Sequence, residues 1–144
     1  MFTKVVTRIL DIVLSLTILT LLSPLMLIIG ILIALLDRGC IFAENSKRIG
    51  KNGKYFDMYK FRSMIPNAHE IILNDKNLKE LKKKWIIQDK LPIDRDPRIT
   101  IIGKLIRRFD IEELPQFFNV LKGEMSIVGP RPWFPEEIER NLKK

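Results

Sequence analysis

The sequence has very little of the side-chain chemistry that builds disulfide frameworks or zinc sites. It contains one cysteine, Cys40, and one histidine, His69, among 144 residues. The chain therefore cannot form a disulfide framework or a Cys/His metal cage of its own, and a reducing, cytosolic environment suits it. With no second ligand type close to it, His69 is expected to be structural. Internal repeats and low-complexity tracts are also lacking, and the length corresponds to one domain.

The sequence also has fewer acidic than basic residues. Asp and Glu number 17 against 25 Lys and Arg, which gives a formal net charge of +8. A charge of this sign favours anionic partners such as phosphates, acidic lipid head groups or nucleic acid. No nucleic-acid-binding motif accompanies the charge, so we expect no nucleic-acid partner.

Residues 12–36 lack charge altogether. As one helix this run would be about 38 Å long, which is enough to cross a bilayer. Two features argue against a simple span. Ser23-Pro24 lies at the centre of the run, and a proline there removes a backbone hydrogen bond and kinks a helix. Basic residues flank the run on both sides, at Lys4, Arg8, Arg38, Lys47 and Arg48.

Both features suit a re-entrant helix. By the positive-inside rule, the flanking charges would keep both ends of the run in the cytosol. A helix that enters the bilayer, breaks at Ser23-Pro24 and returns meets this condition, and the hydroxyl of Ser23 or Thr20 could bond the freed carbonyl. Prolines also occur in ordinary spanning helices, so the residues alone leave the two topologies equally open.

A β-hairpin is predicted after the apolar run. Asn52-Gly53 is a strong turn signal, and it predicts that Ile41–Ile49 pairs with Tyr55–Phe61. Alternation along the second strand puts Lys60 and Arg62 on the same side. The pattern alone favours a solvated basic face for these two residues.

Residues 67–88 predict a basic amphipathic helix. Leu78, Leu81 and Trp85 recur at helical spacing. Lysines fill the other face, at Lys79, Lys82, Lys83 and Lys84. Such a helix either lies on an anionic membrane surface or packs on the domain with solvated lysines, and the pattern favours neither.

The remaining chain predicts short elements. Residues 89–98 form a charged loop with turn signals at both prolines. A short helix is expected at Lys104–Arg108, and another from Asp110 to about Lys122, with Gly123 as its C-terminal stop. Residues 125–128 predict a short strand.

The segment "RRFDIEELPQ" concentrates three carboxylates, Asp110, Glu112 and Glu113, behind two arginines. One interpretation is a helix start, because Asp110 and Glu113 have the spacing of a capping box and Glu112 complements the positive end of a helix. The other is a reaction centre, since a carboxylate beside arginines is held ionised and can act as a nucleophile or hold Mg²⁺. The spacing alone favours capping.

Arg131 adds weight to the second interpretation. It lies between Pro130 and Pro132, after a glycine, on a backbone with little freedom. A rigidly held arginine suits bidentate binding of phosphate. Acid, cation and a membrane segment together suggest phosphoryl chemistry at a lipid surface.

Four stretches carry a family resemblance: "YKFRSM" (59–64), "DPRIT" (96–100), "ELPQFFNVLKGEMSIVGPRP" (113–132) and Ser23-Pro24 within the hydrophobic run. Together they resemble the bacterial sugar transferases, which are monotopic polyprenyl-phosphate phosphoglycosyl transferases. The resemblance extends from Arg8 to Glu137. It implies a re-entrant helix broken at Ser23-Pro24. It also implies transfer of a sugar-1-phosphate from a UDP-sugar to polyprenyl phosphate, releasing UMP.

The resemblance also assigns roles to residues. The family's Asp-Glu pair maps onto Glu112 and Glu113, which implies that Glu112 forms a covalent phosphosugar intermediate and helps to hold Mg²⁺. Binding of substrate phosphate is expected at Lys60, Arg62, Arg107 and Arg131.

Three departures from the family pattern accompany the match. Glu112 stands where the family has an aspartate, and its extra methylene can displace a nucleophile by about an ångström, at a loss of roughly a hundredfold in rate. The stretch "FAENSKRIG" differs from the usual glutamine-rich pattern. The chain also ends at Lys144, whereas family members usually continue for tens of residues.

The sequence thus predicts an α+β, mainly helical, membrane-associated domain. Residues 1–40 would form the re-entrant hairpin and residues 41–144 a C-terminally truncated catalytic domain on the cytoplasmic face of the bacterial plasma membrane, in contact with its lipids. Two alternatives remain: a non-catalytic relative that serves as a membrane-bound interaction module, and a basic tethered protein that binds acidic lipid or nucleic acid. The sugar, the glycan pathway and homodimer formation are left open.

Overall fold

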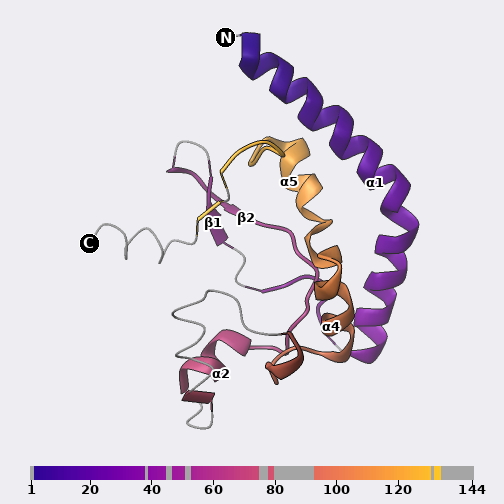
Figure 1. The fold of residues 1–144 in the computed structure, drawn as a ribbon, viewed down its shortest axis with the longest axis vertical. Helices are drawn as coiled ribbons and strands as arrows, with labels where there is room; N and C mark the ends of the chain where they lie inside the picture. Colours follow the sequence, from indigo (N-terminus) through magenta and orange to yellow (C-terminus); the bar gives the residue numbers. More distant parts are fainter. Residues whose placement is uncertain are drawn as a thin grey trace.

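The computed structural model describes residues 2–37, 39–44, 47–50, 53–74, 78–79, 93–130 and 132–133. This part of the chain is mainly helical, with a two-stranded antiparallel sheet (Figure 1). In chain order its elements are α1 (Phe2–Leu36), β1 (Lys47–Ile49), β2 (Tyr55–Asp57), α2 (Ala68–Asn74), the 3₁₀ helix η3 (Ile93–Arg95), α4 (Ile101–Arg108), the 3₁₀ helix η4 (Ile111–Glu113) and α5 (Gln116–Lys122). The predicted mainly helical α+β class is confirmed for the described residues.

Helix α1 is continuous over 35 residues, with Pro24 inside it. It bends near its middle and arches around α5 and α4 (Figure 1). Pro24 has no N–H to donate to the carbonyl of Thr20, and the hydroxyl of Ser23 donates to that carbonyl instead, at 2.9 Å. The predicted break is therefore a bend with a local replacement for the lost hydrogen bond. The re-entrant hairpin is not confirmed, because α1 does not fold back on itself.

By length and composition α1 is able to cross a membrane. Its N-terminal part nevertheless docks on the rest of the domain through polar contacts. Arg8 donates from both terminal nitrogens to two carbonyl oxygens in the last turn of α5, at 2.6 Å each. Asp11 is buried and accepts from the N–H of Ile127 at 3.0 Å and from the hydroxyl of Ser126 at 3.1 Å. No sequence motif marks Asp11 for this role, although it directly precedes the uncharged run.

The C-terminal end of α1 is packed into the same domain. It contributes to the core cluster Ile29, Ile33, Phe61, Ile102 and Ile106. Arg62 donates to the carbonyl of Asp37 at 2.9 Å, where α1 ends. Its guanidinium lies so close to Gly39 that a Cβ at that position would collide with it.

The predicted hairpin is confirmed, with strands of three residues each. In the antiparallel register Lys47 lies opposite Asp57, Arg48 opposite Phe56 and Ile49 opposite Tyr55. Gly53 has φ 71°, a left-handed conformation that glycine adopts without strain. A further bridge joins Phe42 to Phe61, and their rings stack with centroids 5.9 Å apart.

The helices of the C-terminal half differ from prediction in detail. Helix α4 begins at Ile101, earlier than expected, because the Thr100 side chain accepts a hydrogen bond from the N–H of Gly103 at 2.9 Å. The helix expected from Asp110 is instead the 3₁₀ helix η4 followed by α5, which begins at Gln116, so the predicted start is wrong. Gly123, with φ 79°, caps the end of α5, and the predicted stop is confirmed. The strand predicted at 125–128 is wrong, because in this segment the N–H of Ile127 binds a side chain of α1 instead of another strand.

Helix α2 covers the first part of the helix predicted over 67–88, and His69 lies in it. Of the apolar residues that define the predicted amphipathic face, Leu78 is described, whereas Leu81 and Trp85 lie outside the described residues. A membrane-facing surface on this helix therefore stays a prediction.

Candidate active site

Two carboxylates and two basic side chains from distant segments meet in one cluster. Lys60 Nζ lies 3.4 Å from Oε1 of Glu112 and 3.5 Å from Oε1 of Glu113. Arg107 Nε lies 3.7 Å from the same Oε1 of Glu112. These four residues, here called the carboxylate cluster, come from the segment after β2, the last turn of α4 and the 3₁₀ helix η4. All four had been predicted to belong to the site.

The turn between α4 and η4 presents the carboxylates. Asp110 has φ 53° and ψ 23° there, in the left-handed region that Asp tolerates better than most residues. Its side chain makes no capping hydrogen bond. The capping-box interpretation of Asp110 is therefore wrong. Asp110 contributes a backbone turn, and a helix cap does not explain the acidic segment.

The two carboxylates have different environments. The side chain of Glu112 is 5% exposed, whereas the side chain of Glu113 is 47% exposed. Lys60 and Arg107 both approach Oε1 of Glu112, and its buried Oε2 has no hydrogen-bond partner among the described residues. Burial of a carboxylate is unfavourable unless partners compensate its charge. Oε2 is therefore the oxygen of Glu112 whose charge no partner among the described residues compensates directly.

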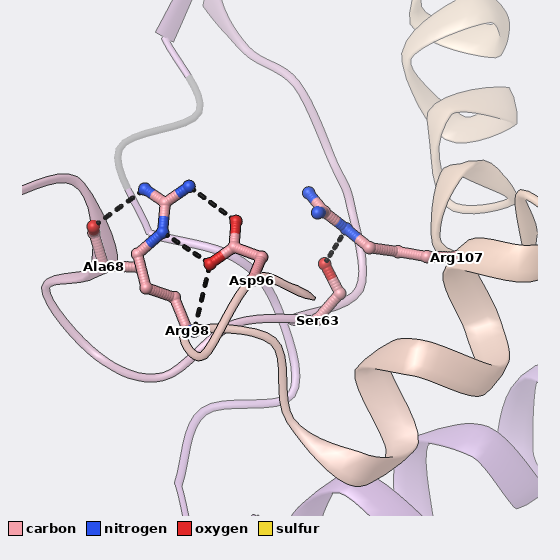
Figure 2. A network of polar contacts seen from close by, with 5 residues as sticks. All are labelled: Ser63, Ala68, Asp96, Arg98 and Arg107. Atoms are coloured by element: carbon pink, nitrogen blue, oxygen red, sulfur yellow. Dashed lines mark hydrogen bonds and ion pairs between the residues drawn. The ribbon is translucent and has the colours of Figure 1, made fainter. Parts of the chain in front are cut away.

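Arg107 is held in place by Ser63. Its Nε donates to Ser63 Oγ at 3.1 Å (Figure 2), and the carbonyl of Ser63 accepts from the N–H of Thr100 at 3.2 Å. Burial lowers the pKa of the Arg107 guanidinium, and the nearby carboxylates of Glu112 and Asp96 oppose that effect. An arginine stays protonated in this setting, so the cluster retains a fixed positive charge.

A second pair, Asp96 and Arg98, stands beside Arg107 (Figure 2). Both side chains are buried, and Arg98 donates to the two carboxylate oxygens of Asp96, at 2.9 and 2.7 Å. Arg98 also donates to the carbonyl of Ala68 at 3.1 Å. Burial opposes ionisation of Asp96, but the hydrogen bonds from Arg98 outweigh it and lower the pKa of Asp96. The pair joins the start of α2 to the loop before α4, a role that is not evident from the motif "DPRIT" alone.

Arg62 does not join the cluster. It is buried, and its contact with the carbonyl of Asp37 anchors the end of α1. The interpretation of Lys60 and Arg62 as a solvated basic face is therefore wrong. Lys60 is 22% exposed and faces the carboxylates, and Arg62 serves the packing of α1.

Arg131, the remaining predicted phosphate ligand, lies outside the described residues. The chain leading to it is described: Ser126 and Ile127 bind Asp11, as noted above, and Gly129 and Pro130 are exposed. No group of three or more His, Cys, Asp or Glu that could hold a metal ion occurs within the described ranges.

An apolar groove of about 420 Å³ lies along α1. Residues of α1 from Leu19 to Ala34 line one wall, and Phe42, Phe61 and Phe118 contribute to the other. Successive side chains of an extended segment point to opposite sides. Phe61 thus faces the groove, and its neighbour Lys60 faces the carboxylate cluster.

The sequence matches one protein family along nearly its whole length, and the similar curated proteins include sugar phosphotransferases. The family model described as bacterial sugar transferase matches residues 2–144. An undecaprenyl-phosphate galactose phosphotransferase of Salmonella typhimurium is 41% identical over 140 residues, covering 92% of this chain and 27% of that protein. The exopolysaccharide production protein ExoY of Sinorhizobium fredii is 38% identical over 130 residues, covering 90% of this chain and 56% of that protein.

A third relative, from Aeromonas hydrophila, is named UDP-N-acetylgalactosamine-undecaprenyl-phosphate N-acetylgalactosaminephosphotransferase. It is 40% identical over 136 residues, covering 92% of this chain and 28% of that protein. The chain thus spans from about a quarter to just over half of the length of these curated relatives.

Proposed function

The chain is a member of the bacterial sugar transferase family, and on this premise we propose that it transfers a sugar-1-phosphate from a UDP-sugar to polyprenyl phosphate and releases UMP. Relatives named for undecaprenyl phosphate support the acceptor, and one named for a UDP-sugar supports the donor. The observation that carries the proposal is the buried carboxylate of Glu112 between the cations of Lys60 and Arg107. The reaction would initiate synthesis of a surface polysaccharide, in line with relatives named for exopolysaccharide production.

Glu112 is the nucleophile in this proposal. Its Oε2, which has no partner among the described residues, attacks the phosphorus that carries the sugar. A carboxylate O–P bond forms, the P–O bond of the pyrophosphate bridge breaks, and UMP leaves with the bridging oxygen. A phosphate oxygen of polyprenyl phosphate then attacks the same phosphorus. The acyl-phosphate bond breaks, which regenerates the carboxylate and yields the polyprenyl diphosphate sugar.

The cations make this attack feasible. A carboxylate and a pyrophosphate repel each other, and positive charges fixed beside the reacting atoms offset that repulsion. Lys60 and Arg107 both lie on Oε1 of Glu112, so two positive charges stand beside the proposed nucleophile while Oε2 has no partner among the described residues. Arg131 is expected to bind phosphate as well. Arg62 is better assigned to anchoring α1.

A Mg²⁺ ion fits the same residues. Mg²⁺ is commonly held by one or two carboxylates together with substrate phosphates. Glu112 and the half-exposed Glu113 would supply the protein's share. The ion would offset the negative charge of the donor pyrophosphate.

We assign α1 to the membrane as a re-entrant helix. Arg8 and Asp11 near its start and Asp37 at its end all bind the same domain, so both ends would lie on one side of the bilayer. The side of α1 away from the domain is apolar and exposed, at Leu21, Leu25 and Ile28 among others. Lipid would cover this surface while the domain stays on the cytoplasmic face.

Helix α4 supports that orientation. Ile101, Leu105 and Phe109 follow one another at four-residue spacing and are exposed, with Lys104 and Arg108 beside them. An exposed apolar row flanked by basic residues suits the boundary of an anionic membrane. The carboxylate cluster at the end of α4 would then lie near the lipid head groups, where the acceptor phosphate is found.

The test is UMP release from membranes that contain the protein. We expect one UDP-sugar from a panel to yield UMP in the presence of Mg²⁺ and polyprenyl phosphate, and no UMP with Glu112→Gln. Absence of UMP with every donor, from folded protein in membranes supplied with acceptor, would reject the proposal in favour of a non-catalytic interaction module.

A further inference from the structure

The side chain of Asn119, on α5, holds the segment that carries Lys60. It is fully buried. Its Oδ1 accepts from the N–H of Tyr59 at 2.8 Å, and its Nδ2 donates to the carbonyl of Asp57 at 2.8 Å and to Oε2 of Glu124 at 2.6 Å. The amide therefore takes the place of a neighbouring strand at the end of β2, because it satisfies a C=O and an N–H on one edge of the extended backbone.

A second fixed point lies on the other side of Lys60. The N–H of Phe61 donates to the carbonyl of Glu112 at 2.9 Å. The backbone before Lys60 is thus bound to α5 through Asn119, and the backbone after it is bound to η4. The side chain between these points reaches both carboxylates of the cluster.

We infer that Asn119 is a positioning residue for the transfer reaction: its amide fixes the backbone of residues 57–61 so that the Lys60 ammonium stays on Glu112 and Glu113. The reaction itself rests on the proposed function, whereas the placement of Lys60 can be tested without it. Asn119 has no contact with the cluster side chains among its hydrogen bonds and acts through Lys60.

Packing alone does not explain an amide at this position. Burying an amide is unfavourable unless its polar groups are hydrogen-bonded. Val120, the next residue, is also buried and supplies apolar packing to α5. The amide at 119 is explained by the two backbone groups that it binds.

The first experiment is a double-mutant cycle on single-turnover transfer from the UDP-sugar to the protein. Asn119→Ala should slow this step by up to about a hundredfold, the loss expected for ångström-scale misplacement. With Lys60→Met already present, the same change should slow it by less than about threefold, because residues that act through one another are not additive. Val120→Ala is the control, because it truncates another buried side chain of the same helix. It should slow the transfer step by less than about threefold, even if it destabilises the protein as much as Asn119→Ala does.

A second variant changes the same contact without truncating the side chain. Asn119→Asp combined with Glu124→Gln keeps the acceptor for Tyr59 and the contact with residue 124, and it replaces the donor to the carbonyl of Asp57 with a carboxylate oxygen that repels it. We expect a loss of at least about tenfold, because one hydrogen bond is lost and a charge is buried against a carbonyl. Equal effects of Asn119→Ala with and without Lys60→Met would overturn the inference. Full activity of folded Asn119→Ala, or of the folded Asn119→Asp/Glu124→Gln double variant, would also overturn it.

The second experiment needs no catalysis. Lysines are labelled with acetic anhydride for a short time and quantified by peptide mass spectrometry. Asn119→Ala should raise the labelling rate of Lys60 several-fold and leave the exposed Lys54 unchanged. Unchanged labelling of Lys60 would overturn the inference even if the enzyme is active. Faster labelling in a protein that transfers no sugar phosphate would support the placement and reject the proposed function.

Discussion

Nζ of Lys60 lies 3.4 Å from Oε1 of Glu112, although the two residues are 52 positions apart in the chain (112 − 60). The contact leaves the other oxygen of Glu112 buried and without a partner among the described residues. We expect Lys60→Met to lower UMP release by about two to three orders of magnitude, since fixed charges at a reacting centre contribute on that scale. Lys54→Met, which removes an exposed lysine in the hairpin region, is the control and should retain full activity. Equal activity of the two variants would show that Lys60 is not part of the machinery.

The cluster illustrates what a sequence can and cannot predict. The stretches that carry the family resemblance identified Glu112, Glu113, Lys60 and Arg107 as candidates, because these residues lie within short, recognisable motifs. The capping role of Asp110 was predicted from spacing and was wrong, since spacing does not reveal that its backbone is left-handed. That conformation belongs to the turn that joins α4 to η4, and the spacing of charged residues does not specify the turn type.

Long-range polar contacts were also not predicted from the sequence. Asp11 binds a loop 116 residues away, and Asn119 binds a backbone group 60 residues away. Neither has a local signature, because Asp and Asn bind many kinds of partner. The hairpin and the stop at Gly123 were predictable, since both depend on residues within a few positions of each other.

The buried pair of Asp96 and Arg98 should make stability depend on acid pH. The folded pKa of Asp96 lies below the ordinary value of 3.8, so its ionised form stabilises the fold at pH values above about 4. This contribution is lost as the pH falls through the folded pKa. Thermal unfolding in nanodiscs should show a steep loss of stability below about pH 4.

Asp96→Asn is the variant that isolates this effect. It should destabilise the protein at neutral pH by about 3–5 kcal/mol, because it leaves Arg98 buried without its counter-charge, and it should flatten the acid dependence. Asp94→Asn, at an exposed position in the same segment, is the control. It should change neither the stability at neutral pH nor its dependence on acid pH. An acid dependence in Asp96→Asn as steep as in the unaltered protein would assign the effect to other groups.

Gly103 and Gly30 are two helical glycines that differ in the space available for a Cβ atom. A Cβ on Gly103 would collide with the carbonyl of Ser63, whereas one on Gly30 would lie 3.7 Å from Ile41 Cγ2, an ordinary contact. Gly103→Ala should therefore destabilise the fold by about 1–3 kcal/mol and lower activity by displacing Ser63 from Arg107. Gly30→Ala should be neutral or slightly stabilising, because alanine favours the helix. Equal unfolding temperatures for the two variants would contradict the close approach of α4 to Ser63.

Topology can be measured by cysteine labelling in intact cells. Single cysteines at positions 3 and 45, in a Cys40→Ser background, should both resist a membrane-impermeant maleimide added from outside and react after permeabilisation. Pro24→Ala should straighten α1 and make position 3 reactive from outside in part of the molecules. Reactivity of position 3 from outside in the unaltered sequence would indicate a spanning helix and exclude the re-entrant arrangement.

Detection of a covalent sugar phosphate on Glu112 is the most direct test of the proposed mechanism. Protein in nanodiscs is mixed with its UDP-sugar and Mg²⁺ in the absence of acceptor, and its peptides are analysed by mass spectrometry. We expect one sugar phosphate on Glu112. The adduct should also form in Asp110→Asn, be absent from Glu112→Gln and be removed when polyprenyl phosphate is added. An adduct on Asp110, or one that persists in Glu112→Gln, would contradict it.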